Sequence, residues 1–138
     1  MQLNLKTDYA VRILIYLTCA SPGILSSAET IGNSMGISPQ SIAAIMRPLK
    51  DKGWIENKLG ATGGYRIAEK PENISLFDIA SVTEGTLKIN RCLEQDGLCS
   101  INGVSSCPVH QFYLNLQNTI ERELKRATIA SLLKVNAV

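Results

Sequence analysis

The chain has 138 residues, a formal net charge of +2, four cysteines and a single histidine. This length suits one domain, or a small domain with an added dimerisation element, and the near-neutral charge excludes a polycation that binds nucleic acid by charge alone. The single histidine excludes a metal site built from several histidines of one chain. No apolar run reaches the roughly 18 residues of a membrane-spanning helix, and no secretory signal is recognisable. We therefore expect a cytoplasmic protein without a membrane partner, whose cysteines are reduced.

Two helices are predicted at the beginning of the chain. Thr7 is a candidate N-cap for a helix over residues 8–20. Ser26 and Glu29 have the spacing of a capping box, which predicts the start of a short second helix. Gly36 then has the residue type that most often ends a helix.

A third helix is predicted after a tight turn. Ser38 can cap it, Pro39 suits its first position, and Gly53 marks its end. Pro48 conflicts with this helix, because proline lacks the backbone N–H and tends to kink the axis. Two short helices joined by the turn at residues 36–38 predict a helix-turn-helix.

A β-hairpin is predicted directly after the third helix. Residues 54–58 and 65–68 alternate like short strands, and the segment 59–64 between them is rich in turn-forming residues. A helix-turn-helix followed by a hairpin is the arrangement of a winged helix. One more short helix is expected from its N-cap, Ser75, to about Thr83.

The last part of the chain combines an irregular loop with a long helix. Residues 85–106 have no regular period, and a helix is predicted to begin near Cys107. Its apolar stripe consists of Val109, Phe112, Leu116, Ile120, Leu124 and Ala127. The stripe packs either on its own domain or on a second copy of the chain, and we favour the dimer interface.

The predicted fold is mainly α with a small β-hairpin wing. We divide it into a winged helix-turn-helix domain over residues 1–83, a cysteine-rich sensor loop over 84–106, and a dimerisation helix with the C-terminal segment over 107–138.

Positive charge is concentrated in the winged half. Residues 1–70 contain eight Lys/Arg and five Asp/Glu, whereas the remainder contains six and seven. Such a local excess suits contacts with DNA phosphates, and the start of the second helix of a helix-turn-helix meets base edges. The candidate DNA-binding residues are Ser38, Gln40, Ser41, Arg47, Gly63, Gly64 and Arg66.

These candidates differ in what they can recognise. Gln40 can pair bidentately with adenine, whereas a serine is less selective. Gly63 and Gly64 would allow the wing tip to approach DNA closely, and Arg66 is a candidate phosphate contact. The alternatives stay open: Ser38 is only an N-cap, or the winged domain binds a protein.

Three cysteines and the histidine are clustered in the sequence. Cys92, Cys99 and Cys107 have the spacing Cys-x6-Cys-x7-Cys, and His110 follows one helical turn later. Thiolates suit iron–sulfur clusters and zinc, so the alternatives are an iron–sulfur site, a zinc site, a thiol redox sensor or incidental cysteines. Cys19 lies among apolar residues of the first helix, and we expect it in the core.

The chain resembles the Rrf2 family of winged-helix transcription regulators. The residues responsible are Leu3–Leu14, Gly36-Ile37-Ser38, Gly60–Ala68, the three-cysteine loop and the long helix after it. The resemblance implies a homodimeric repressor or switch that binds double-stranded DNA and has no small-molecule substrate. It also implies an iron–sulfur cluster at the subunit interface, although the protein can be isolated without it.

The resemblance implies two possibilities for the fourth ligand of the cluster. Cys92, Cys99 and Cys107 would be ligands in both. The IscR branch uses a histidine that corresponds to His110, which goes with a 2Fe–2S cluster. The NsrR branch uses an aspartate of the partner subunit that corresponds to Asp8, which goes with a 4Fe–4S cluster. We favour Asp8 and the 4Fe–4S cluster, because Thr-Asp-Tyr matches that branch.

Several residues depart from the usual pattern of the family. The spacings of six and seven residues between cysteines are longer than usual, and Leu59 stands where an arginine is common. Ala43 and Ala44 replace polar side chains on the recognition helix, so its DNA target should not be taken from a relative.

The sequence therefore predicts a transcription regulator and not an enzyme. Its DNA affinity would be controlled by a cluster that senses nitric oxide, redox state or iron–sulfur status. The alternative is a repressor of the same fold without a cluster, controlled by thiol oxidation or by a partner protein.

Overall fold

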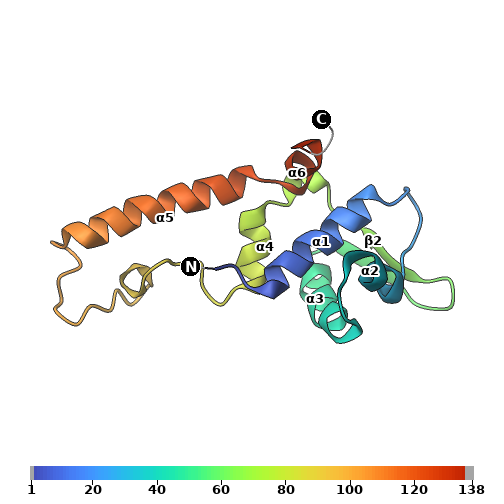
Figure 1. Cartoon of the computed structure of the whole chain (residues 1–138), viewed down its shortest axis with the longest axis horizontal. Coiled ribbons are helices and arrows are strands. Elements are labelled where there is room, and N and C mark those ends of the chain that lie inside the picture. Colours follow the sequence, from blue (N-terminus) through green and yellow to red (C-terminus); the bar gives the residue numbers. More distant parts are fainter. Residues whose placement is uncertain (1, 136–138) are drawn as a thin grey trace.

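The computed structural model describes residues 2–135 as a winged domain from which one long helix projects (Figure 1). The elements in chain order are α1 (Leu5–Cys19), α2 (Ala28–Met35), α3 (Pro39–Asp51), β1 (Ile55–Lys58), β2 (Gly64–Ile67), the 3₁₀ turn η1 (Pro71–Asn73), α4 (Leu76–Thr83), the 3₁₀ turn η2 (Arg91–Leu93), α5 (Pro108–Arg126) and α6 (Ile129–Val135). The predicted mainly α fold with a two-stranded wing is confirmed. None of the helices in this part of the chain is long and apolar enough to cross a membrane.

Helix α1 lies at the centre of the winged domain. It packs against α2, α3, α4, α6 and β2. Ala10, Ile13, Leu14 and Leu17 follow one another at spacings of three and one along its inner face and are fully or almost fully buried. Burial of each large aliphatic side chain contributes about 1.5–3 kcal/mol, so this face holds the helix-turn-helix and the wing on one core.

The start of α1 differs from the prediction. The N-cap is Asn4 and not Thr7, because the Asn4 Oδ1 accepts a hydrogen bond from the Thr7 backbone N–H at 3.0 Å. Thr7 is instead buried, and its hydroxyl lies 2.6 Å from that of Thr83 and 2.5 Å from the Glu84 carboxylate. Both residue types can cap a helix, and here the threonine hydroxyl joins α1 to the end of α4.

The start of α2 is also displaced by one residue. Ser27 is the N-cap, and its Oγ accepts from the Thr30 N–H at 3.1 Å, so the predicted capping box at Ser26 is wrong. The backbone of Ser26 pairs with Tyr65 of the wing in both directions, at 3.0 and 2.8 Å. Gly36 ends α2 in the left-handed conformation with φ +68°, as predicted.

Helix α3 agrees with the prediction at its beginning. Ser38 caps it and Pro39 occupies its first turn. The helix continues through Pro48 and ends at Asp51, two residues before the predicted boundary at Gly53. Pro48 removes a hydrogen bond to the carbonyl of Ala44, which is an exposed residue, so water can replace the missing donor.

Strands β1 and β2 form an antiparallel hairpin in which Ile55 faces Ile67 and Lys58 faces Gly64. Gly64 has φ +151°, and a Cβ there would lie 2.6 Å from the carbonyl oxygen of Ser26. A Cβ at Gly63 would lie 2.0 Å from the carbonyl oxygen of Lys58. Gly63 is therefore required where the hairpin turns, and Gly64 is required where the wing packs on the domain, roles that the sequence did not indicate.

Replacing Gly64 with alanine should destabilise the winged domain. The new Cβ would meet the Ser26 backbone in a conformation that non-glycine residues rarely adopt, which costs about 1–3 kcal/mol. Urea unfolding should show a lower free energy of unfolding by this amount. Gly85→Ala is the control, because nothing lies within 4 Å of a Cβ at Gly85. Equal stability of the two variants would contradict the packing role of Gly64.

The end of the chain returns to the winged domain, which was not predicted. Helix α6 follows α5, and its Ile129 is fully buried in the core. The Leu76 N–H donates to the Ala127 carbonyl at 2.7 Å, and the Ile129 N–H donates to the Ile74 carbonyl at 2.9 Å. These bonds fix the C-terminal end of α5 next to α4. Its apolar stripe therefore has a covered half and an exposed half.

Candidate functional site

The predicted base-reading residues lie at the start of α3, where two of them are used for capping. The Ser38 Oγ accepts from the Ser41 N–H at 3.3 Å and donates to the Ser41 Oγ at 3.0 Å. Gln40 and Arg47 are exposed, and neither forms a hydrogen bond or ion pair with a side chain in residues 2–135. The geometry thus leaves Gln40 and Arg47 as the side chains of this set that are available to DNA.

The wing contains an ion pair that the sequence did not indicate. Arg66 and Glu56 are opposite each other in the hairpin and form a salt bridge, with about half of each side chain exposed. An exposed pair of this kind contributes about 0–1 kcal/mol, so a phosphate can compete with Glu56 for the guanidinium. Gly63 ends the turn of the hairpin and Gly64 is the first residue of β2.

Four exposed cations surround these residues without an ion pair in the described part of the chain. They are Arg47, Lys50 and Lys52 of α3 and its end, and Lys58 of β1. By contrast, Arg12 pairs with Asp8 at 2.7 Å and donates to the Met35 carbonyl at 3.1 Å, so it joins α1 to α2. The four exposed cations on α3 and the wing provide the local positive charge that phosphate contacts need.

Two of the three loop cysteines meet the histidine at the beginning of α5. Cys107 is the N-cap of α5, and its sulfur accepts from the His110 N–H at 3.4 Å. The His110 Nδ1 lies 3.2 Å from the sulfur of Cys92, which belongs to η2. The side chains of Cys92 and His110, 18 positions apart in the sequence, are thus in contact.

Cys99 is on the loop between η2 and α5. Hydrogen bonds from the backbone N–H groups of Gly103 and Ile101 lower the pKa of the Cys99 thiol, which favours the thiolate. Within residues 2–135, no three side chains of histidine, cysteine, aspartate or glutamate converge closely enough to hold a metal ion. Cys99 is therefore apart from Cys92 and His110 in this conformation.

The remaining candidate ligand, Asp8, lies on α1 and is exposed. Its carboxylate is paired with Arg12 of the next helical turn. The fourth cysteine, Cys19, is exposed at the end of α1 and is not in the core, which corrects the prediction. It faces solvent because the buried positions of this helix end at Leu17.

The donor chemistry of the cysteine segment suits a thiolate-ligated metal group. Cys92 and Cys107 supply soft sulfur ligands, and His110 supplies a borderline nitrogen ligand. Only the Cys92 sulfur and the His110 imidazole are in contact, and Cys107 meets His110 through the backbone N–H. The residue types thus fit the group, but Cys99 and the Cys107 sulfur would have to move towards the other two donors; the Cys99 loop is exposed, with Leu98 and Ile101 59% and 80% exposed.

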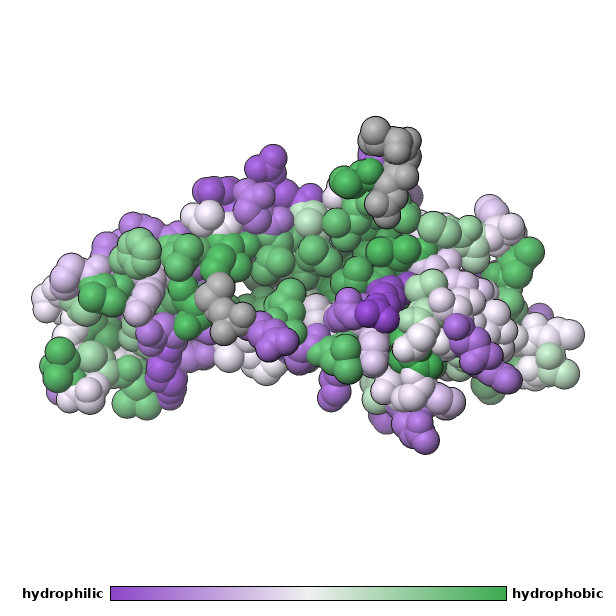
Figure 2. Space-filling model, viewed as in Figure 1, coloured by the Kyte–Doolittle hydropathy of each residue, from purple (hydrophilic) through white to green (hydrophobic). Residues whose placement is uncertain are grey.

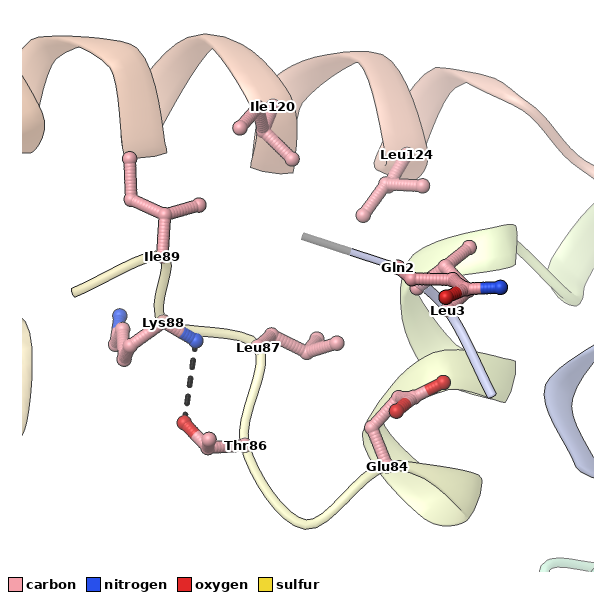
Figure 3. Close-up of a pocket in the computed structure, with 9 residues that line it drawn as sticks. All are labelled: Gln2, Leu3, Glu84, Thr86, Leu87, Lys88, Ile89, Ile120 and Leu124. Atoms are coloured by element: carbon pink, nitrogen blue, oxygen red, sulfur yellow. Dashed lines mark hydrogen bonds between the residues drawn. The ribbon is translucent and has the colours of Figure 1, made fainter. Parts of the chain in front are cut away.

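A hollow of about 420 Å³ lies between α5 and the chain that leads to the cysteines. Figure 3 shows Ile120 and Leu124 of α5 on one side and Leu87 and Ile89 on the other, with Glu84 at the end of α4. The full lining consists of Gln2, Leu3, Glu84, Thr86, Leu87, Lys88, Ile89, Ile120 and Leu124. The covered half of the α5 stripe therefore faces the segment before η2.

Over residues 3–135 the chain matches the family described as "Rrf2: Iron-dependent Transcriptional regulator". The chain belongs to the Rrf2 family. Protein aau3 of Rhizobium meliloti (strain 1021) is 33% identical to this Rrf2 chain over 136 residues, which are 97% of the chain and 86% of that relative. The HTH-type transcriptional regulator NsrR of Bacillus subtilis (strain 168) is 32% identical over 105 residues, which are 75% of the chain and 72% of NsrR.

The fold also matches a solved structure. CymR (YrzC), the global cysteine regulator of B. subtilis, has a TM-score of 0.80 with this Rrf2 chain at 19% identity, and the match covers 98% of each. The predicted family and the winged-helix fold are confirmed. Membership of the Rrf2 family makes the protein a DNA-binding transcription regulator and not an enzyme, as expected.

Proposed function

We propose that this Rrf2 protein is a cytoplasmic homodimeric repressor whose DNA affinity is controlled by an iron–sulfur cluster. Cys92, Cys99 and Cys107 would bind the cluster. The observation that carries the proposal is the contact of the His110 imidazole with the Cys92 sulfur at the start of α5, the helix that Cys107 caps. The description of the family as iron-dependent supports it.

The geometry supports His110 as the fourth ligand more than it supports Asp8. His110 already lies 3.2 Å from the Cys92 sulfur, whereas the carboxylate of Asp8 is held by Arg12. An Asp8 of the partner subunit would have to exchange this ion pair for the metal. We therefore propose a 2Fe–2S cluster in place of the 4Fe–4S cluster that the sequence favoured.

The helices of this chain indicate how the cysteine site would influence DNA binding. When bound, an iron–sulfur cluster supplies a centre that responds to oxidants and nitric oxide. Cys107 caps the first turn of α5, to which His110 belongs. The opposite, C-terminal end of α5 is fixed to α4 by backbone hydrogen bonds. A change at the first turn would thus alter how two copies of α5 meet. That meeting sets the separation of the recognition helices, which must fit half-sites about one DNA turn apart.

A cluster-free thiol sensor of the same fold is the second candidate. The lowered pKa of Cys99 favours it, because the thiolate is the form that oxidants attack. Non-reducing gels after mild oxidation, together with DNA binding of the Cys99→Ser variant, would test it. If DNA affinity does not respond to oxidation, this candidate is wrong.

Anaerobic purification with assays of iron and acid-labile sulfide tests the main proposal. We expect a coloured protein with about two iron and two sulfide per subunit when His110 is the ligand, and about four of each per subunit when Asp8 is. A colourless protein that contains no iron and fails anaerobic reconstitution would overturn the cluster.

Two substitutions separate phosphate contacts from base reading. Arg66→Ala should weaken binding to all DNA sequences and reduce the salt slope of log K by about one, since one phosphate contact is lost. Gln40→Ala should also change the sequence preference, because its free amide can pair with a base edge. Binding curves on the operator and on random DNA, at several salt concentrations, measure both effects. If both variants lose the same affinity on every sequence, Gln40 does not read bases.

A further inference from the structure

Gln117 is the buried polar side chain of α5. Only 1% of its surface is exposed, and its amide groups are bonded to the chain that leads to the cysteines. Its Oε1 accepts from the Ile89 N–H at 2.9 Å, and its Nε2 donates to the Leu87 carbonyl at 3.0 Å. Residues 87–89 have no strand partner among the described residues. The Gln117 amide supplies the hydrogen bonds that the peptide group of a neighbouring strand would otherwise make.

A second interaction strengthens this attachment one helical turn later. The Nε2 of Gln117 also donates to Glu121 at 3.0 Å, and the Lys88 ammonium binds the same carboxylate at 3.1 Å. Partial burial raises the pKa of Glu121, but the hydrogen bonds from Gln117 and Lys88 outweigh it and keep the pKa below its ordinary value. The carboxylate therefore stays charged and fixes Gln117 and Lys88 together.

The position of Gln117 along α5 relates it to the cysteine site. Gln117 lies seven residues after His110, which is two turns on the same face and about 10 Å along the axis. The segment runs antiparallel to α5, since Leu87 and Ile89 meet Gln117 and Cys92 meets His110.

Only two residues, Asn90 and Arg91, separate Ile89 from Cys92, so the chain between the two contacts is short. Asn90 accepts a hydrogen bond from the Cys92 N–H at 3.3 Å, and this capping contact starts the 3₁₀ turn η2. The position of the Ile89 backbone thus determines the position of the Cys92 sulfur. Figure 3 shows the same segment passing under α5, with the Ile89 side chain directed towards the helix.

We propose that Gln117 is a positioning residue for the cysteine site: it holds the backbone at Leu87 and Ile89 so that Cys92 meets His110. The inference rests on the proposed function, to which it adds a residue that touches no cluster ligand. Gln117 fixes the chain that enters the site, whereas Cys107 and His110 are fixed by α5 itself. The pairing of sulfur and imidazole then depends on one buried amide.

The test compares Gln117→Met with Gln111→Met in the full chain. Methionine fills the space of glutamine but leaves the Ile89 N–H and the Leu87 carbonyl without partners. Gln111 is exposed on another face of α5, and its side chain bonds only to Asn115, so its variant is the matched control.

Two measurements on the cluster-free, reduced protein examine the geometry directly. In Gln117→Met, the Ile89 amide should exchange with deuterium about tenfold faster, because a hydrogen bond of ordinary strength is lost. Iodoacetamide should alkylate Cys92 faster relative to Cys99 of the same molecule. A general loss of stability would accelerate both thiols, whereas loss of positioning changes their ratio. Gln111→Met should match the wild type in both measurements.

The third measurement examines the loaded protein, in which Gln117→Met should lose iron to a chelator several-fold faster than the wild type. If Gln117→Met fails to fold, Gln117→Asn replaces it, since its amide is one methylene shorter and cannot reach both Ile89 and Leu87, and it adds no charge beside Glu121. Unchanged Ile89 exchange and an unchanged Cys92-to-Cys99 ratio would overturn the positioning role. A wild-type protein that takes up no iron would instead overturn the proposed function, and the first two measurements would still decide the role of Gln117.

Discussion

Replacing Cys107 with serine is expected to abolish iron uptake while α5 remains intact. Cys107 is the N-cap of α5, and its sulfur accepts the His110 N–H at 3.4 Å. Serine is among the strongest N-cap residues, so the hydroxyl can take over this bond and maintain the helix. It is a much poorer ligand for iron than a thiolate. The substitution therefore removes the proposed ligand and retains the structural role of the residue.

Iron and sulfide contents after anaerobic reconstitution measure the first effect, and circular dichroism with urea unfolding measures the second. We expect iron to fall to background, with a free energy of unfolding within about 0.5 kcal/mol of the wild type. DNA affinity should no longer depend on whether the protein was reconstituted.

Cys19→Ser is the control for this experiment. Cys19 is exposed on α1 and belongs to none of the contacts of the cysteine site. Its variant should retain full iron content and its response. If Cys107→Ser also retains full iron, the three-cysteine ligand set is wrong, because the remaining thiols would suffice.

The winged domain could be predicted from the sequence because its signals are local. Ser38 and Pro39 open α3, Gly36 ends α2, and Ser75 begins α4, and each acts within one helical turn. The errors at Thr7 and Ser26 have a common physical cause. Each has a neighbour that can cap equally well, and the residue left over bonds to an element distant in the sequence.

Contacts between distant segments could not be predicted in this way. Ile129 completes the core from the far end of the chain, and Arg66 is neutralised by Glu56 across the hairpin. Their sequence neighbourhoods carry no sign of either partner. The burial of Gln117 could not be predicted either, since a glutamine on a helix is usually solvated and this one is 1% exposed.

The cysteine site was predictable in composition and only partly in geometry. The one-turn spacing of Cys107 and His110 fixes their proximity once α5 is recognised. The approach of Cys92 to His110 depends on the path of the intervening loop, which Gln117 and Asn90 determine from outside the motif. Spacing alone therefore grouped the candidate residues but could not rank Asp8 against His110.

Introducing a charge at Phe112 is expected to dissociate the proposed homodimer and to weaken DNA binding strongly. Phe112 is 62% exposed on α5, and Val109 and Leu116 beside it are 52% and 37% exposed. Figure 2 shows apolar surface running along α5 towards the rest of the molecule. A monomeric soluble protein rarely leaves such a surface uncovered, and a second copy of α5 would cover it. Phe112→Asp would place a carboxylate in that contact.

The expected sizes of the two effects follow from the exposure of Phe112 and from divalent binding. Because Phe112 makes few contacts within its own chain, the fold of the monomer should be unaffected. Two linked domains bind two half-sites with an avidity that exceeds one domain by about 10²–10⁴, so a monomer should lose roughly this factor. Sedimentation equilibrium gives the oligomeric state, and binding to an operator with two half-sites gives the affinity.

Asn118→Asp supplies the matched control, since it adds the same charge on the opposite, exposed side of α5. We expect this variant to remain dimeric and to bind the operator like the wild type. A single half-site should bind Phe112→Asp and the wild-type domain equally, because the recognition helix is unchanged. If Phe112→Asp stays dimeric with wild-type affinity, the exposed half of the α5 stripe does not hold the two copies together. The coupling proposed between the first turn of α5 and DNA would then need another route.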